Sequence, residues 1–396
     1  MKILVINCGS SSIKFKFFEM PEEKVVSYGI VEKIGEEISI FKYSGKVNIE
    51  NKLKVKNHQE GLKLIASTLL ENEIKDIEEI RGIGHRVVHG GEGFVSSVRI
   101  DDEVIKKIEE HLYLAPLHNP HNLAGIKGCM EIFPKSIQVA SFDTAFHTTM
   151  PELSFLYAIP YDFYQKYKIR RYGFHGTSHR YVARRTSEIM GKGKYEINVI
   201  TCHLGNGCSI TAVKNGKSYD TSMGLTPLEG LIMGTRSGDI DPGVILYLIE
   251  GLNLKPSEVS DILNKKSGLL GVSGVSNDFR NLLPLYNKDE RVTLSIDMFC
   301  YRLKKYIGSY MAVLGNVDAI TFTGGIGENV PLVREKSLSN MEMFGIKIDI
   351  EKNKKIIGKE GEISSEDSKV KVFVIPTNEE LRIAFDTYQI VLNSTS

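Results

Sequence analysis

The chain has 396 residues, of which 42% are hydrophobic and 25% charged, the composition of an ordinary globular protein. A single hydrophobic core rarely grows beyond about 250–300 residues, so two domains are expected. The formal net charge of +1 excludes a strongly basic surface for nucleic acid or for a membrane.

The five cysteines are odd in number and scattered, so they predict neither a disulfide framework nor a zinc site. The apolar run at residues 3–6 is too short for a signal peptide, and no stretch of about 18 apolar residues follows. We therefore expect a cytoplasmic protein with no nucleic-acid or membrane partner.

The chain opens with a pattern typical of three strands. Residues 3–6 form an uninterrupted apolar run, and a turn at 7–12 follows it. Residues 13–17 then alternate apolar and lysine side chains, which indicates a half-buried strand. Residues 24–31 are interpreted as a third strand.

The same pattern returns near the middle of the chain. Residues 197–202 predict a strand, 203–207 a glycine-rich turn, and 209–214 a second strand. Asn215-Gly216 then predicts a type I′ hairpin turn into a third strand. Two such openings suggest a duplicated domain, although three-strand meanders are common.

Helices are predicted over 58–75, 292–314 and 378–392, the last burying Leu381, Ala384, Phe385, Tyr388 and Leu392. A strand at 318–323 leads into a glycine-rich turn at 324–329, and Asn329 is expected to cap the helix that follows. Strands are mixed with helices throughout the chain, which indicates an α/β protein.

Three glycine-rich turns each follow an apolar strand, where backbone N–H groups can approach phosphate oxygens. None matches the P-loop or the dinucleotide-binding fingerprint. A single turn of this kind is explained as well by a tight hairpin, but three of them favour phosphate binding. Lys14 shares strand parity with Ser10 and Ser12 and could face the same phosphate, or belong to a solvated strand face.

Two arginines lie between glycines, Arg86 in the segment 84–91 and Arg236 in the segment 234–239. Small neighbours let a ligand reach the guanidinium group, although a structural ion pair is an equal alternative for either one alone. Together they suit a reaction between two anions, such as phosphoryl transfer. His175 and His179 have H-x-x-x-H spacing, but the surrounding glycines and β-branched residues argue against a helix there, so zinc is not expected. His175 is interpreted as a hydrogen-bond donor, although a lone histidine is more often structural.

Two acidic residues are candidates for the same chemistry. Asp143 follows the predicted strand 139–142, and strand ends commonly display catalytic groups. Glu379 lies in the first turn of the last helix, where an acid is favoured by the helix dipole or holds Mg²⁺.

These motifs resemble the acetate kinase (acetokinase) family of the acetate and sugar kinase, Hsp70 and actin superfamily. The matching segments run in order over almost the whole chain: 7–15, 84–91, 114–120, 142–147, 170–179, 203–207, 226–242, 277–280, 324–329 and 376–381. The departures are Cys8 and Cys208, which stand where small residues are usual and could make the enzyme thiol-sensitive.

The resemblance implies two duplicated actin-like, ribonuclease H-like domains, 1–145 with 380–396 and 146–379, with a catalytic cleft between them, and usually a homodimer. It implies catalysis by Asp143 as proton donor or acceptor, with His175 and Arg236 stabilising the transition state. Mg²⁺, for which Mn²⁺ may substitute, is assigned to Asn7 and Glu379.

The substrate assignments also come from the resemblance. Acetate is assigned to Arg86, with an apolar pocket for its methyl group made of Val88, Leu117, Phe174 and Pro227. ATP or ADP is assigned to Lys14, His203, Leu204, Gly205, Asn206, Gly207, Asp278, Phe279, Arg280, Gly325, Ile326, Gly327, Glu328 and Asn329.

The expected reaction is reversible, magnesium-dependent transfer of the γ-phosphoryl group of ATP to acetate, which gives acetyl phosphate and ADP. Propionate or butyrate kinases share this chemistry and are the nearer alternative. An ATP-driven binding switch like Hsp70 or actin is the more distant one, but it would need neither the two arginines nor a small apolar pocket.

Overall fold

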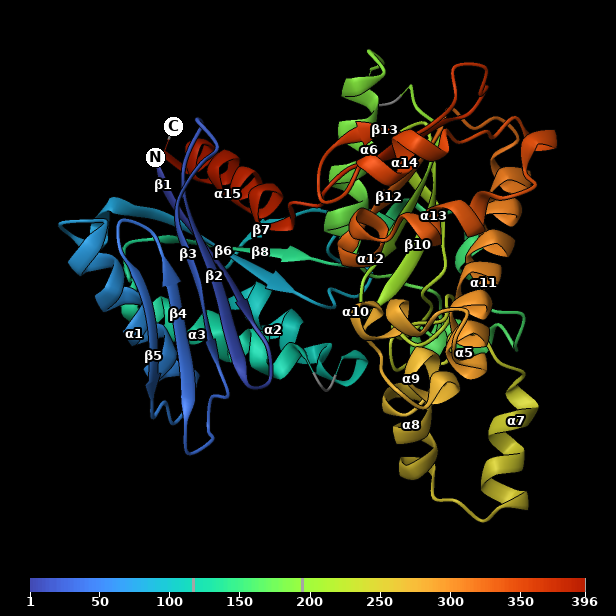
Figure 1. Ribbon diagram of the computed structural model, residues 1–396. Helices are drawn as coiled ribbons and strands as arrows, with labels where there is room; N and C mark the ends of the chain where they lie inside the picture. The colour runs from blue at the N-terminus through green and yellow to red at the C-terminus, as the bar shows by residue number, and fades with distance from the viewer. Residues whose placement is uncertain (116–117, 194–195, 396) are drawn as a thin grey trace. The chain divides into compact units, whose positions relative to one another are not determined.

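The computed structural model describes residues 1–115, 118–193 and 196–395. The chain forms two compact units: unit 1 comprises Met1–Thr148 and Asn378–Ser396, and unit 2 comprises Thr149–Thr377. Each contains a mixed β-sheet with helices packed against it (Figure 1). No helix in the described ranges is long and apolar enough to cross a bilayer.

Unit 1 is built on an eight-stranded sheet of order β5-β4-β3-β2-β1-β6-β8-β7. The first five strands pair antiparallel, whereas β1, β6 and β8 run parallel to one another. The strands are β1 (Lys2–Cys8), β2 (Ser12–Glu19), β3 (Lys24–Glu32), β4 (Ser39–Ser44), β5 (Asn48–Leu53), β6 (Ile80–Val87), β7 (Val98–Arg99) and β8 (Ile137–Phe142).

Unit 2 repeats this arrangement in a six-stranded sheet of order β11-β10-β9-β12-β14-β13. An antiparallel meander is again followed by two parallel strands and a short antiparallel edge strand, as in β3-β2-β1-β6-β8-β7. The strands are β9 (Val199–Leu204), β10 (Cys208–Lys214), β11 (Lys217–Thr221), β12 (Ala319–Thr323), β13 (Gly361–Glu362) and β14 (Lys371–Val374). The predicted pair of matching openings is therefore confirmed.

The helices fill the connections between strands. In unit 1 they are α1 (His58–Asn72), η1 (Ile77–Glu79), α2 (Asp102–Glu110), η2 (Leu112–Leu114), α3 (Asn119–Ile132) and α15 (Glu379–Thr395). The short helix η3 (Ala145–Thr149) comes after β8, where the chain passes from unit 1 to unit 2. In unit 2 they are α4 (Glu152–Phe155), α5 (Asp162–Tyr167), α6 (Gly176–Ile189), α7 (Pro242–Leu246), η4 (Tyr247–Gly251), α8 (Pro256–Lys265), α9 (Gly268–Ser273), α10 (Phe279–Leu282), η5 (Leu283–Leu285), α11 (Glu290–Leu314), α12 (Gly324–Asn329), α13 (Pro331–Leu338), η6 (Glu342–Phe344) and α14 (Ile350–Lys355).

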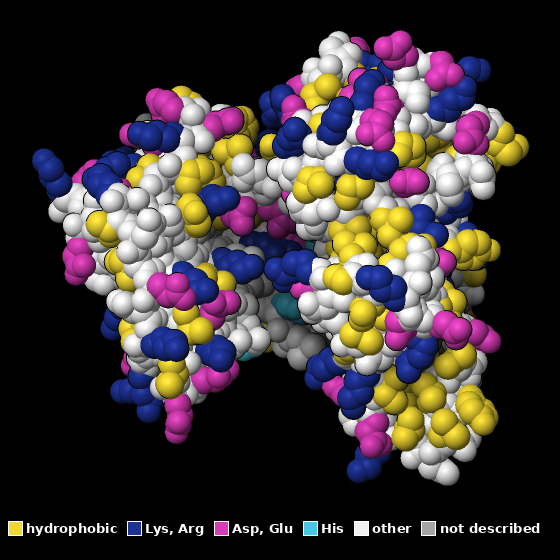
Figure 2. Space-filling model, in the orientation of Figure 1, with side chains coloured by type: hydrophobic (Ala, Val, Ile, Leu, Met, Phe, Trp, Pro, Cys, Tyr) yellow, Lys and Arg dark blue, Asp and Glu magenta, His cyan; other side chains and the backbone are white. Residues whose placement is uncertain are grey.

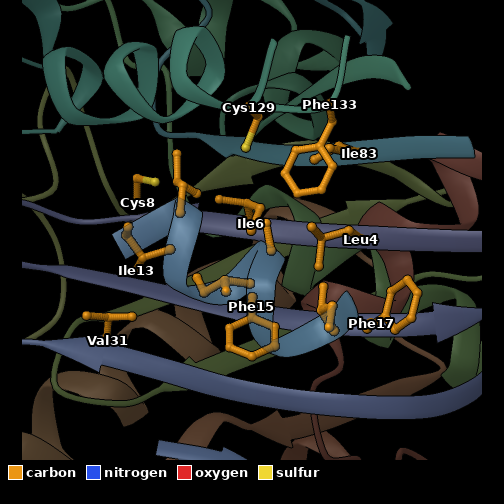
Figure 3. Packing of buried hydrophobic residues seen from close by; sticks show 14 of the residues in the cluster. Leu4, Ile6, Cys8, Ile13, Phe15, Phe17, Val31, Ile83, Cys129 and Phe133 are labelled. Carbon is orange, nitrogen blue, oxygen red and sulfur yellow. The ribbon is translucent and has the colours of Figure 1, made fainter. Parts of the chain in front are cut away.

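The apolar run of β1 is buried on both faces of the sheet of unit 1. Leu4 and Ile6 pack in one cluster, which includes Cys129 of α3 and Phe133, the residue that follows this helix (Figure 3). Ile3 and Val5 point to the opposite face and pack against α15. Successive strand residues alternate between faces, so an uninterrupted apolar run is what a two-sided core requires.

Several predicted elements are confirmed. Helix α11 buries the predicted stripe of Ile296, Phe299, Leu303, Ile307, Tyr310 and Leu314. Asn215 and Gly216 have φ of 50° and 69° between β10 and β11, as a type I′ turn requires.

Three local predictions are wrong. Residues 324–329 form helix α12, and Asn329 is its last residue, donating to the Gly325 carbonyl instead of capping α13. His179 lies within α6, because glycine at the helix start does not prevent a helix from forming. In α15 Ala384 is buried as predicted, and Leu381, Phe385 and Tyr388 are partly buried against the same core, but Leu392 is exposed. Ile383 and Val391 are buried positions that the prediction missed.

Candidate active site

The polar centre of unit 1 lies at the carboxyl ends of two neighbouring parallel strands. Arg86 is near the end of β6, and Asp143 follows the last residue of β8. The Arg86 Nε lies 3.0 and 3.2 Å from the two Asp143 carboxylate oxygens, and its Nη2 lies 2.8 Å from Oδ2. This is a forked ion pair, and it leaves Nη1 of Arg86 for another acceptor.

Glu379, at the start of α15, brings a second carboxylate to the same guanidinium. Its Oε2 lies 3.9 Å from Arg86 Nη1, and its side chain is 18% exposed. Burial raises the pKa of Glu379, and repulsion from Asp143 and Glu380 adds to the rise, while Arg86 and Lys14 oppose it. The nearby acids, Asp143 above all, hold the pKa of Arg86 well above its usual value. Arg86 is therefore a cation that two acids share.

Asn7 and Lys14 belong to the same part of unit 1, because they are paired across β1 and β2. Asn7 and Glu379 offer an amide oxygen and a carboxylate, which are the hard oxygen donors that Mg²⁺ prefers. Within the described ranges no group of three His, Cys, Asp or Glu could hold a metal. A small donor set fits Mg²⁺, which usually keeps waters and substrate phosphates as its other ligands.

One asparagine ties this centre to a predicted pocket residue. The Val88 N–H donates to Asn122 Oδ1 at 3.1 Å, and Asn122 Nδ2 donates to the Cys8 carbonyl at 2.8 Å. Asn122 thus fixes the backbone beside Arg86 to the end of β1, next to Asn7. Val88 itself is half-buried.

In unit 2, His175 immediately precedes α6 with a φ of 56°, and its ring is held by a buried chain of polar groups. Its Nδ1 lies 2.9 Å from Ser209 Oγ, which lies 2.7 Å from Nε2 of His179. His179 Nδ1 continues the chain to Thr201 Oγ1 at 2.7 Å. One hydroxyl carries one proton, so Ser209 donates to at most one of the two histidines.

His203 stacks on His175, with 4.2 Å between the ring centroids. Its Nδ1 lies 2.8 Å from Ser178 Oγ, which also lies 2.7 Å from Thr377 Oγ1. The end of β9, the first turn of α6 and the segment after β14 are therefore joined by side-chain hydrogen bonds.

Arg236 and His175 converge on one glycine. A Cβ atom added to Gly207 would lie 3.4 Å from Arg236 Nη1 and 3.6 Å from His175 Nε2. Arg236 Nη1 also donates to the Pro227 carbonyl at 3.1 Å, and burial lowers the pKa of Arg236. The turn between β9 and β10 thus has a cation and an imidazole beside its backbone, which suits an anionic group in a reaction.

A pocket of about 480 Å³ lies beside this turn, formed by three segments of unit 2. Its lining residues are Gly205, Asn206, Asn277, Asp278, Phe279, Arg280, Leu283, Gly325, Ile326, Asn329 and Val330. The segments come from the β9–β10 turn, from residues around α10, and from α12, so backbone groups of two glycine-rich segments face one cavity. Asn277 Nδ2 links two of them by donating to Asn206 Oδ1 at 2.9 Å.

The structure thus gathers eight of the predicted ATP residues around one pocket, and it places the others elsewhere. Glu328 Oε1 accepts from the backbone N–H groups of Gly324 and Thr377, at 2.8 and 3.1 Å. His203, Leu204, Gly207, Gly327 and Glu328 are near the pocket in sequence but do not line it, and Lys14 belongs to unit 1.

The predicted methyl-pocket residues are divided between the units. Val88 is in unit 1, Phe174 and Pro227 are in unit 2, and Leu117 lies outside the described residues. Phe174 is buried, whereas Pro227 is half-buried. The 480 Å³ pocket of unit 2 is also lined by three residues that the sequence did not predict. They are Asn277, Leu283 and Val330, and each adjoins or lies near a predicted segment.

The two unusual cysteines are both inaccessible. Cys8 packs in the core of unit 1, and Cys208 is buried at the start of β10. Burial raises the pKa of each thiol to about 12, so both stay protonated near neutral pH. Because the thiolate is the reactive form, neither position has the features of a reactive thiol.

The chain is similar to known proteins over almost its whole length. The acetate kinase of Thermoanaerobacter pseudethanolicus is 55% identical, covering 99% of both chains. The crystal structure of Porphyromonas gingivalis acetate kinase matches with a TM-score of 0.94 at 49% identity, covering 98% of this chain and 99% of that one. A propionate kinase structure from Francisella tularensis matches with a TM-score of 0.93 at 45% identity and the same coverage.

The model of the acetokinase family matches residues 2–385, which include Asp143 and Glu379 of unit 1 and the whole of unit 2. Relatives above 50% identity extend that match over almost all of the chain. The chain therefore belongs to the acetokinase family.

Proposed function

We propose that this protein is an acetate kinase, which transfers the γ-phosphoryl group of ATP reversibly to acetate and forms acetyl phosphate and ADP. The observation that carries the proposal is the convergence of Arg236 and His175 on Gly207, beside a pocket lined by glycine-rich segments. A phosphoryl transition state spreads charge over its equatorial oxygens, so it needs oriented donors at one point. Membership of the acetokinase family supports the same reaction.

In the proposed reaction, a carboxylate oxygen of acetate forms a bond to the γ-phosphorus of ATP. The bond from that phosphorus to the β–γ bridging oxygen breaks, and its electron pair leaves with ADP. No proton moves, because acetate is already ionised at neutral pH. The protein therefore has to align the two anions and neutralise charge more than it has to supply a strong base.

We assign the acetate carboxylate to the Nη1 side of Arg86, where the Glu379 carboxylate is 3.9 Å away. Asp143 holds the guanidinium through Nε and Nη2, so Nη1 points away from that ion pair. In this role Asp143 orients the Arg86 guanidinium. Because the proposed reaction moves no proton, it needs this orientation more than it needs a proton donor or acceptor. ATP is assigned to the pocket of unit 2, and His175 and Arg236 to the transferred phosphoryl group.

Mg²⁺, or Mn²⁺ in its place, would be held by Asn7 and Glu379 and would neutralise charge on the ATP phosphates. The raised pKa of Glu379 supports this assignment, since a buried carboxylate near other acids is stabilised by a bound cation. Lys14, paired with Asn7 across the sheet, is assigned to the phosphates as well.

The preferred acid should be acetate, then propionate, with butyrate poor. A roomy pocket would favour longer acids by about 0.8 kcal/mol per buried methylene, whereas a tight one penalises them by about 1–3 kcal/mol. Discrimination by size is limited to roughly 10–200-fold per methylene, so some propionate activity should remain. A propionate kinase among the relatives makes that acid the main alternative substrate.

The test is kcat/KM for the three acids on wild type and on Val88→Ala. Removing the Val88 methyl groups should narrow the preference for acetate by lowering the KM for propionate. Val104→Ala, the same truncation at a partly buried position of α2, is the control. A wild-type preference for butyrate, or an unchanged acetate-to-propionate ratio in Val88→Ala, would contradict the assignment.

We also propose that the protein is a homodimer through the α7 surface, defined as Val244, Leu246, Tyr247 and Leu252. All four are exposed, between 43% and 64%, and α7 and η4 bury no residue of their own. Figure 2 shows hydrophobic side chains gathered at this end of unit 2. Exposed apolar patches of this kind are typical of interaction sites.

Sedimentation velocity should therefore give twice the monomer mass for the wild type. Leu246→Asp should shift the protein towards monomer, because a charge is costly in an apolar interface. Ile38→Asp, at a site in unit 1 that is also 58% exposed, should leave the mass unchanged. A Leu246→Asp protein as dimeric as the wild type would remove the α7 surface from the interface.

A further inference from the structure

Arg236 is carried on a loop whose two ends are hydrogen-bonded together. The Asp239 N–H donates to the Gly230 carbonyl at 3.0 Å, and the Gly230 N–H donates to Asp239 Oδ1 at 2.7 Å. Gly238, beside this closure, has a φ of 66°, and a Cβ there would lie 2.4 Å from the Leu231 carbonyl oxygen. The base of the loop 230–239 is therefore closed and tightly packed.

Helix α11 holds this closed base from outside. Tyr306 Oη donates to Asp239 Oδ2 at 2.7 Å, using the carboxylate oxygen that the Gly230 N–H does not use. Arg302, one turn earlier, donates from Nη1 to the Gly230 carbonyl at 3.0 Å and from Nη2 to the Asp239 carbonyl at 3.1 Å. Both ends of the loop are thus bonded to one helix.

Helix α11 is a suitable support, since it is 25 residues long and buries a continuous apolar stripe. Side chains of the loop need such support because loops are the more mobile parts of a fold. Further along the loop, the Arg236 carbonyl accepts from the Met233 N–H at 3.1 Å, and the Thr235 carbonyl accepts from the Ser267 N–H at 2.9 Å. These bonds hold the backbone of Thr235 and Arg236 in the closed loop.

We propose that Tyr306 and Arg302 are positioning residues for the phosphoryl transfer. They fix Asp239, and through the closed loop they hold the Arg236 guanidinium beside Gly207. The inference rests on the proposed function, in which Arg236 stabilises the transition state. A misplacement of about 1 Å in such a group can cost as much as 10²-fold in rate. If the two residues are merely structural, they affect stability but not the chemical step.

Tyr306→Phe is the sharpest variant, because it removes one hydroxyl and leaves the ring in place. Its kcat should fall about tenfold, while KM for ATP and for the acid stays within about twofold, since an interaction made only in the transition state affects kcat. Tyr301→Phe makes the same change on the same helix at a side chain that is 66% exposed, and it should behave like the wild type. Arg302→Lys should also lower kcat, because one amine cannot reproduce two separated donors.

A double-mutant cycle with Arg236→Ala distinguishes positioning from a general structural effect. If Tyr306 acts through Arg236, Tyr306→Phe should lower kcat in the wild-type background but change it less than twofold in Arg236→Ala. Equal losses in both backgrounds, or an unchanged kcat in Tyr306→Phe, would overturn the inference. The cycle uses whichever of acetate, propionate and butyrate the wild type phosphorylates best. A wild-type protein that phosphorylates none of these three acids would refute the proposed function itself.

Discussion

Replacing Arg86 with alanine should lower kcat/KM for acetate by about 10³-fold, which is the largest single effect expected in this protein. Loss of one oriented donor typically costs about 10²–10³ in rate. Arg86 does more than that, because Asp143 and Glu379 both depend on its charge. The alanine variant leaves two neighbouring buried carboxylates without their cation, so acetate binding, magnesium binding and stability should all suffer.

The measurement is kcat and KM for acetate, ATP and Mg²⁺, together with the melting temperature. Arg81→Ala is the matched control, since Arg81 lies on the same strand, β6, but is exposed. Asp143→Asn combined with Arg86→Ala should recover stability but not activity, because it removes the acid that was left unpaired. An Arg86→Ala enzyme with near wild-type kcat/KM would make the ion pair purely structural and refute the assignment of acetate to Arg86.

The sheets of both units could be predicted from local pattern, because their central strands have clear periodicity. The uninterrupted run at 3–6 and the alternation at 13–17 match β1 and β2, and Asn215-Gly216 has the dihedral angles of the predicted turn. The helix at 324–329 could not be predicted, because three of its first four residues are glycines, and each glycine disfavours a helix by about 1 kcal/mol. Tertiary bonds compensate: Arg334, fully buried, donates to the carbonyls of Gly327 and Glu328.

The individual site residues could be picked out by their motifs, but their pairing could not. Arg86 and Asp143 are 57 positions apart, and they meet only because β6 and β8 are parallel neighbours in register. The support of Arg236 by Tyr306 spans 70 positions that include α7, α8, α9, α10 and the first part of α11, and no local pattern marks it. Asn277 and Leu283 line the pocket because separate segments fold together there.

Glu379→Gln should lower activity by about 10²-fold and leave the protein at least as stable as the wild type. The activity of this variant should partly recover at high Mg²⁺. The amide keeps the size and the oxygen donor but lacks the charge that a hard cation prefers. Glu380→Gln is the control: this neighbour in α15 has a side chain that is 40% exposed and is paired only loosely with Lys16, at 3.6 Å. Its replacement should change neither the magnesium dependence nor the activity by more than about twofold.

The stability expectation follows from the direction of the pKa shift. Burial raises the pKa of Glu379 in the folded protein above its value in the unfolded chain. The folded state therefore holds the proton more tightly, so stability from this group is full at low pH and is lost as pH rises through the raised pKa. Glutamine cannot lose a proton, so the free energy of unfolding of Glu379→Gln should fall less than that of the wild type between acidic and neutral pH. Denaturant melts of both proteins across that range, without added Mg²⁺, measure the difference. A variant that is less stable than the wild type at neutral pH, with a normal magnesium dependence, would show that Glu379 serves the helix start and not the cation.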